Sequence, residues 1–238
     1  MLLSSGISAL KWDIPLPLHA PDGFFSLPLA IAGYAVAALV IALAVRRTHG
    51  ELNERMVPMM GVMAAFIFAA QMINFPVAGG TSGHLIGGAL AAIILGPWAA
   101  ILVMTAVVGL QALLFQDGGL VVLGINLINM SIVSVLAGYG AYRLAIKIGS
   151  SARPTLFIGG FASAWVSVMM AAVFTAFALA LSGTSPLSLA LPALAIVHAL
   201  IGIGEGLITV FALSFIRAAR PELLQVRPQS QAQLAEGV

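Results

Sequence analysis

Long runs of apolar residues, separated by short polar or glycine-rich turns, follow one another along most of the chain. The hydrocarbon core of a bilayer takes about 20 residues of helix, so apolar runs of this length predict transmembrane helices. The predicted spans are residues 27–46, 57–74, 84–96, 98–116, 120–145, 156–181 and 189–216. The pattern therefore predicts an all-α polytopic membrane protein with about seven transmembrane helices.

The composition agrees with this pattern. Hydrophobic residues make up 61% of the 238 residues, charged residues make up only 8%, and the mean hydropathy is +1.10. A water-facing surface would need many more charges. In the predicted topology, the basic residues of the loops on one side are Arg46, Arg47, Arg55, Arg143, Lys147, Arg153, Arg217, Arg220 and Arg227.

Only Lys11 falls on the other side of the predicted membrane. By the positive-inside rule, the N-terminus is then outside the cell and the C-terminus is cytoplasmic. The net charge of +2 thus reflects topology, and we expect no binding to nucleic acid.

The chain is expected to form one transmembrane domain over residues 18–217. Residues 1–17 lack the features of a signal peptide and are predicted to be an extension on the outer face. Residues 218–238 are polar and are predicted to be a disordered cytoplasmic tail. Because the chain has no cysteine, a metal ion would have to be bound by nitrogen, oxygen or thioether ligands.

Polar side chains at membrane depth are costly, and in this chain they cluster in the segment "QMINFPVAGGTSGHLIGG", residues 71–88. Its proline and glycines cannot sustain a regular helix, and irregular backbone at this depth has to be buried in protein or line a wet cavity. We therefore predict a glycine-rich re-entrant loop on the outer side, with His84 at the start of the next helix.

The last span contains a second polar group of residues. In "VHALIGIGEGLIT", His198 and Glu205 are seven residues apart, which places them two turns apart on one face of a helix. The spacing of Gly202 and Gly206 is typical of close helix packing. We expect His198 and Glu205 to be a structural polar pair and favour this over a catalytic or transport role.

Two histidines lie on the outer side in the predicted topology. His19 stands in "LPLHAPDGFF", residues 16–25, just before the first span, and His84 stands in the glycine-rich segment. Imidazole binds first-row divalent metals well, although a lone histidine in an apolar setting is more often a satisfied core residue. A metal site and an anion site in the glycine-rich loop both remain open from the spacing alone.

An enzymatic alternative starts from "GTSG", residues 80–83, which matches the G-x-S-G pattern of rhomboid intramembrane serine proteases. Ser82 would be the nucleophile and His198 the general base. In those proteases a glycine follows the histidine at a three-residue offset, whereas Gly202 follows His198 by four residues. The match is short, and this alternative is the weaker one.

Five motifs carry a resemblance to a known family. They are "HAPDGFF" (19–25), the segment from "AAFIFAAQMINFPVAGG" to "LGPWAA" (64–100), "QALLFQDGGL" (111–120), "GINLINM" (124–130) and "HALIGIGEGLIT" (198–209). In order and spacing they resemble the CbiM/NikM family, the cobalt and nickel substrate-binding membrane components of energy-coupling-factor transporters.

This resemblance implies a metal-capture subunit in the inner membrane of a prokaryotic cell, with no intrinsic cofactor and divalent cobalt or nickel as the transported ion. It implies work with a transmembrane coupling (T) protein and two cytoplasmic ATPase subunits, and with a small accessory membrane subunit in some systems. The subunit itself would not be an enzyme. The sequence does not distinguish cobalt from nickel; neighbouring genes for cobalamin biosynthesis would indicate cobalt.

The resemblance also implies a ligand set. The family's metal site uses a histidine near the mature N-terminus and a histidine in the loop motif, which correspond to His19 and His84. It further uses the backbone nitrogen of the first histidine and the amine of the preceding residue, which gives a nearly planar set of four nitrogens. A ligating imidazole usually donates its other N–H to a fixed acceptor, and Asn74, Thr81 and Ser82 are the candidates for that role. Capping of the broken backbone by the same three residues is an equal alternative.

This chain departs from the family because Leu18, which precedes His19, has 17 residues ahead of it. The Leu18 backbone nitrogen is an amine only if Leu18 is the mature N-terminus. Translation from the Leu18 codon, cleavage of residues 1–17, and a rebuilt site using Asp13 or Asp22 are three explanations that remain open. Binding is expected to weaken as the pH falls, because the ligand nitrogens must be deprotonated.

Overall fold

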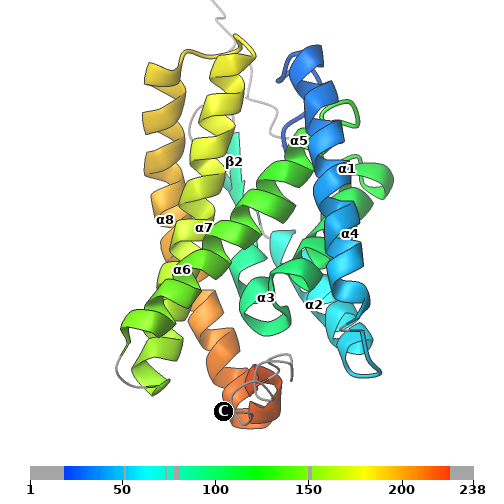
Figure 1. The fold of residues 1–238 in the computed structure, drawn as a ribbon. Coiled ribbons are helices and arrows are strands. Elements are labelled where there is room, and N and C mark those ends of the chain that lie inside the picture. The colour runs from blue at the N-terminus through cyan, green and yellow to red at the C-terminus, as the bar shows by residue number, and fades with distance from the viewer. Residues whose placement is uncertain (1–18, 51, 73, 78–80, 150–151, 226–238) are drawn as a thin grey trace, which may run out of the picture.

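The computed structural model describes residues 19–50, 52–72, 74–77, 81–149 and 152–225. These residues form a helical bundle with one short β-hairpin in its middle (Figure 1). The elements are α1 (Leu27–His49), α2 (Met56–Gln71), β1 (Asn74–Val77), β2 (Thr81–His84), α3 (Gly88–Leu95), α4 (Pro97–Leu114), α5 (Leu123–Leu127), the π-helix η1 (Ile128–Val133), α6 (Ser134–Ile148), α7 (Ala152–Leu181), α8 (Leu187–Ala219) and the 3-10 helix η2 (Pro221–Gln225).

Five helical segments in the described part of the chain are long and apolar enough to cross a membrane: Leu27–His49, Pro97–Leu114, Leu123–Ile148, Pro154–Leu181 and Leu187–Ala219. The third joins α5, η1 and α6 into one continuous helix, as predicted for residues 120–145. α2 is apolar but shorter, and α3 has only eight residues. The protein is thus a multi-pass membrane protein, whereas the count of seven spans remains a prediction.

The predicted break in the helical pattern is present, but its form differs from the expectation. β1 and β2 pair as antiparallel strands, with Asn74 opposite His84 and Val77 opposite Thr81. The expectation that His84 begins a helix is wrong, because His84 ends β2 and α3 begins only at Gly88. Gly87 has a φ of +81°, a left-handed conformation that stops a helix from extending backwards toward His84.

The hairpin and α3 lie between two groups of helices. α6, α7 and α8 pack together on one side, and α1 and α4 stand on the other (Figure 1). α7 and α8 approach closely where a Cβ on Gly206 would lie 2.6 Å from the Phe161 ring and one on Gly202 would lie 2.9 Å from Trp165. The close helix packing predicted from the Gly202 and Gly206 spacing is confirmed.

α1 and α5 also approach closely, and this contact positions the segment that precedes α1. A Cβ on Gly124 would lie 2.4 Å from the backbone nitrogen of Tyr34, so only glycine allows the two helices to lie this near one another. The loop between α4 and α5 is thereby brought against residues 19–25, which we call the strap.

Candidate metal centre

The strap carries His19 into the protein, where the residue is only 5% exposed. Its backbone N–H donates to Asp117 Oδ1 at 3.3 Å, and its Nδ1 lies 3.4 Å from Asp117 Oδ2. A Cβ on Gly118 would lie 2.7 Å from His19 Cβ, and Gly118 has a φ of +94°. One loop, between α4 and α5, thus holds both the backbone and the ring of His19.

The residues after His19 are fastened to the same loop. The Ala20 carbonyl accepts hydrogen bonds from the Gly119 N–H and from Asn126 Nδ2, both at 3.0 Å. Asp22 Oδ1 accepts one from the Val122 N–H at 3.3 Å. A Cβ on Gly119 would lie 2.3 Å from the backbone nitrogen of Asp22, so the strap lies directly on the Gly119 backbone.

His84 comes from the other direction, at the end of β2. Its Nδ1 lies 2.8 Å from the carbonyl oxygen of Leu85. A carbonyl oxygen only accepts hydrogen bonds, so the neutral ring carries its proton on Nδ1 and its lone pair on Nε2. This is the protonation pattern of a histidine that ligates a metal through Nε2.

The structure brings the two rings together. The centroids of His19 and His84 are 5.2 Å apart and their planes are inclined by 61°. A ligating imidazole nitrogen lies about 2 Å from its metal ion, so two rings at this separation have room to share one ion. Both ring nitrogens of His19 are buried, and within the described part of the chain neither makes a hydrogen bond of normal geometry. Burying such a polar atom without a partner is costly, and a metal ion would satisfy one of them.

Two imidazoles alone do not complete a coordination sphere. Among the described residues, no three His, Cys, Asp or Glu side chains lie close enough together to hold a metal ion. An ion between His19 and His84 would therefore need further ligands besides clustered His, Asp or Glu side chains of the described residues. The predicted backbone ligand, Leu18, lies outside the described residues.

The predicted supporting residues lie on the hairpin. Asn74 is in β1, directly opposite His84, and Thr81 and Ser82 are in β2. Their strand backbone is described, whereas their side chains lie outside the description. Their role around the histidines remains a prediction.

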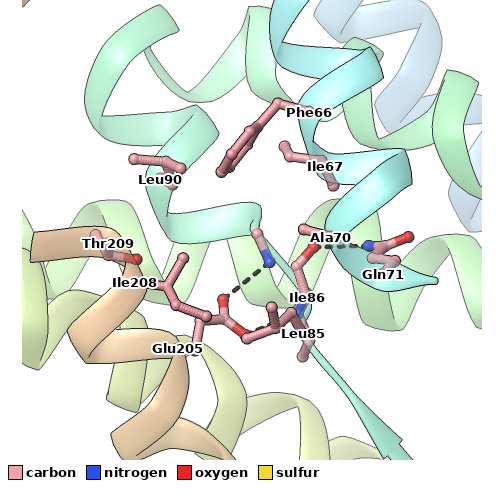
Figure 2. A pocket seen from close by; sticks show the side chains of 11 residues that line it. Phe66, Ile67, Ala70, Gln71, Leu85, Ile86, Leu90, Glu205, Ile208 and Thr209 are labelled. Carbon is pink, nitrogen blue, oxygen red and sulfur yellow. Dashed lines mark hydrogen bonds between the residues drawn. The ribbon is translucent and has the colours of Figure 1, made fainter. Parts of the chain in front are cut away.

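His198 and Glu205 have separate partners and do not form the predicted polar pair. His198 Nδ1 lies 2.8 Å from the Leu194 carbonyl of its own helix. The Glu205 carboxylate accepts hydrogen bonds from the backbone N–H groups of Ile86 and Gly87, at 2.7 and 2.9 Å (Figure 2). A spacing of seven residues places both side chains on one face of the helix, but each of them is hydrogen-bonded to backbone groups instead.

Asp117 is the contact to His19 that the sequence did not assign. Its signal is an acidic residue beside two glycines in an almost uncharged chain, within "QALLFQDGGL". Helical periodicity could not reveal it, because Asp117 and His19 are 98 residues apart and meet only through a loop.

Comparison with known proteins identifies relatives over most of the chain. A family model described as "Cobalt uptake substrate-specific transmembrane region" matches residues 19–223. A Haloquadratum walsbyi protein named for metal transport is 43% identical over 210 residues, covering 87% of this chain and 93% of its own. The cobalt transport protein CbiM of Sorangium cellulosum is 33% identical, covering 87% and 94%.

A nickel transport relative and a solved structure give the same picture. The fused nickel transport protein NikMN of Rhodobacter capsulatus is 31% identical, covering 88% of this chain and 65% of its own. The crystal structure of a transition metal transporter superposes with a TM-score of 0.76 at 33% identity, covering 84% of this chain and 92% of that one. These relatives are transport proteins and not enzymes, so the serine protease alternative with Ser82 and His198 finds no support.

Proposed function

This chain belongs to the CbiM family of cobalt uptake substrate-specific transmembrane proteins, and we propose that it is the metal-capture subunit of an energy-coupling-factor importer for divalent cobalt or nickel. The observation that carries the proposal is the meeting of the His19 and His84 rings, 5.2 Å apart, from two segments that are far apart in the sequence.

We assign the ion to the His19 and His84 imidazoles. The Leu18 backbone nitrogen is the third ligand if Leu18 is the mature N-terminus. The His19 backbone nitrogen is the fourth, and it has to lose the proton that it donates to Asp117 before it can bind the ion. A planar set of nitrogens suits Ni²⁺ and is accepted by Co²⁺. Asn74, Thr81 and Ser82 hold the hairpin side of the site in this proposal.

The proposal includes the membrane orientation and the partners. The last turns of α1, α6 and α8 carry basic residues, among them Arg46, Lys147 and Arg217. Basic helix ends favour the cytoplasmic side, so the C-terminus is cytoplasmic and the N-terminus lies outside. On the cytoplasmic side we place the transmembrane coupling protein and two ATPase subunits, which would hydrolyse the ATP. A small accessory membrane subunit completes the assembly where one is present.

The test is metal binding by the His84→Ala variant. The full-length protein, purified from membranes in detergent, is titrated with NiCl₂ and CoCl₂ by calorimetry, and its intact mass is measured to identify the mature N-terminus. We expect the wild-type protein to bind one ion and His84→Ala to bind none, with an unchanged far-UV circular dichroism spectrum.

The matched control is His198→Ala, because among the described residues His198 is bonded to the backbone of its own helix. We expect this variant to bind metal as the wild type does. Normal metal retention by His84→Ala would refute the site assignment.

A further inference from the structure

The connection between β2 and α3 is held by side chains from two other helices. We call residues Leu85–Gly87 the 85–87 link. From α2, Gln71 Nε2 donates to the Ile86 carbonyl at 2.7 Å. From α8, Glu205 accepts from the N–H groups of Ile86 and Gly87 (Figure 2). The Ile86 residue is thus bonded on both its carbonyl and its N–H side.

Glu205 is an expensive residue to place here. It is only 2% exposed, within one of the most apolar helices of the chain. A carboxylate buried at this depth is tolerated when its oxygens are well bonded, and such residues are commonly functional. Both Glu205 oxygens are used on the 85–87 link, and neither is bonded to a side chain among the described residues.

The 85–87 link has little freedom of its own. Gly87 adopts a φ of +81°, and a Cβ there would lie 3.0 Å from the Ile67 side chain of α2. The backbone therefore turns sharply against α2 immediately before α3. Loss of the Glu205 or Gln71 side chain would remove hydrogen bonds that fasten this turn to α8 or α2.

His84 immediately precedes this link and is bonded to it. Its Nδ1 contacts the Leu85 carbonyl, so the orientation of the ring follows the orientation of the link. We propose that Glu205 and Gln71 clamp the 85–87 link from α8 and α2 and act as positioning residues for His84 as a metal ligand. The inference rests on the proposed function, and it gives Glu205 a role in metal capture that the predicted pair with His198 did not.

The test compares Glu205→Gln with a control in the same helix. Glutamine keeps the size of the side chain, but its amide has only one acceptor oxygen for the two N–H groups. Thr209→Val is the control, because Thr209 is buried one turn further along α8 and lines a small pocket together with Glu205 and Ile86 (Figure 2). The full-length proteins are titrated with Co²⁺, and affinity, the visible spectrum of bound Co²⁺ and the unfolding temperature are measured.

We expect Glu205→Gln to lose about tenfold or more in Co²⁺ affinity, as is typical when support for a metal ligand is removed. The d–d bands of the Co²⁺ that still binds should change, because His84 is turned. Thr209→Val should have the same Co²⁺ affinity and the same d–d bands as the wild type. A purely structural role would lower the unfolding temperature while leaving affinity and spectrum unchanged, and that result would overturn the inference.

Gln71→Met provides a second route that does not depend on Glu205. Methionine has a similar length but no donor for the Ile86 carbonyl. We expect a loss of Co²⁺ affinity in this variant too, and a smaller loss in the double variant than the two single losses predict, because both residues hold one peptide unit.

If Glu205→Gln does not fold, Gln71→Met decides the question, and wild-type affinity in that variant would overturn the inference. A wild-type protein that binds neither Co²⁺ nor Ni²⁺ would instead refute the proposed function, and the clamp would lose its premise.

Discussion

The two histidines of the candidate site are supported in different ways. His19 is contacted directly, by the Asp117 carboxylate and by Gly118, both from the loop between α4 and α5. His84 is supported through the 85–87 link, from α2 on one side and α8 on the other. His19 thus depends mainly on one loop, and His84 depends on helices that are far apart in the sequence.

This difference predicts how the two sides respond to substitution. Changes in the α4–α5 loop should act on the site and leave the helix packing intact, because the loop bonds the strap and is not itself part of a helix. Changes on the α8 side should affect metal binding only where they reach the link. The following substitutions test this contrast, in order of decreasing effect on metal affinity.

Gly119→Ala should have the largest effect. The new Cβ would lie 2.0 Å from Asp22 Oδ1 and 2.3 Å from the Asp22 backbone nitrogen, so the strap has to move away from the loop. We expect Ni²⁺ affinity to fall by about 100-fold, the upper end of the range for lost ligand support. Calorimetric titration measures the affinity.

Gly109→Ala is the matched control, because a Cβ at Gly109 in α4 meets nothing within 4 Å. This variant should bind Ni²⁺ as the wild type does. Wild-type affinity in Gly119→Ala would show that metal binding does not require the observed position of the strap and of His19.

Asp117→Asn should have the next largest effect. Asparagine keeps the volume and one acceptor oxygen for the His19 N–H, but it lacks the negative charge 3.4 Å from the ring. We expect metal affinity to fall by roughly tenfold, because a carboxylate next to a ligating imidazole raises its basicity. The comparison variant is Asp22→Asn, whose side chain bonds the Val122 backbone and not the histidine. Equal losses in the two variants would mean that Asp117 only fastens the strap.

Thr184→Ala should have a small effect. Thr184 Oγ1, after the end of α7, donates to the Phe24 carbonyl at 2.6 Å and is the far attachment of the strap. This hydrogen bond is exposed to solvent, so water replaces the lost hydroxyl. We therefore expect metal affinity to fall by about twofold to threefold, or roughly 0.5 kcal/mol. Parallel titrations of the variant and the wild type would resolve this difference. A tenfold loss would mean that the attachment at Phe24, and not the contact with Asp117, determines the position of His19.

These substitutions also separate what the sequence predicts from what it does not. Apolar runs locate the long helices, because every segment that crosses the lipid has to be apolar and about 20 residues long. The proline and glycines at residues 76–83 locate the break between α2 and α3. Neither feature specifies whether the broken segment forms a loop or, as observed, a pair of strands.

The partners of the polar residues were harder to predict for a physical reason. Helix periodicity places Glu205 and His198 on one face, but a carboxylate binds whichever N–H groups approach it, and here these come from residues 86 and 87. Asp117 reaches His19 because Gln116, with a φ of +55°, and Gly118 turn the chain at the end of α4. Such turns depend on tertiary contacts, which a hydrophobic pattern does not encode.

Gly206→Ala should have the smallest effect on metal binding, although Gly206 adjoins Glu205. The new Cβ would lie 2.6 Å from the ring of Phe161, which is only partly buried. We expect the free energy of unfolding to fall by about 1–3 kcal/mol, while Ni²⁺ affinity stays within about twofold of the wild type. Chemical unfolding and calorimetry measure the two quantities.

Gly204→Ala is the matched control on the same helix, because a Cβ at Gly204 meets nothing within 4 Å. It should leave affinity unchanged and should not lower stability, because alanine is favoured over glycine inside a helix. If Gly206→Ala instead lowers Ni²⁺ affinity tenfold, the support of His84 extends beyond the hydrogen bonds of Glu205 to the seating of α8 on α7. The contrast between the two histidines would then be one between a loop and a whole pair of helices.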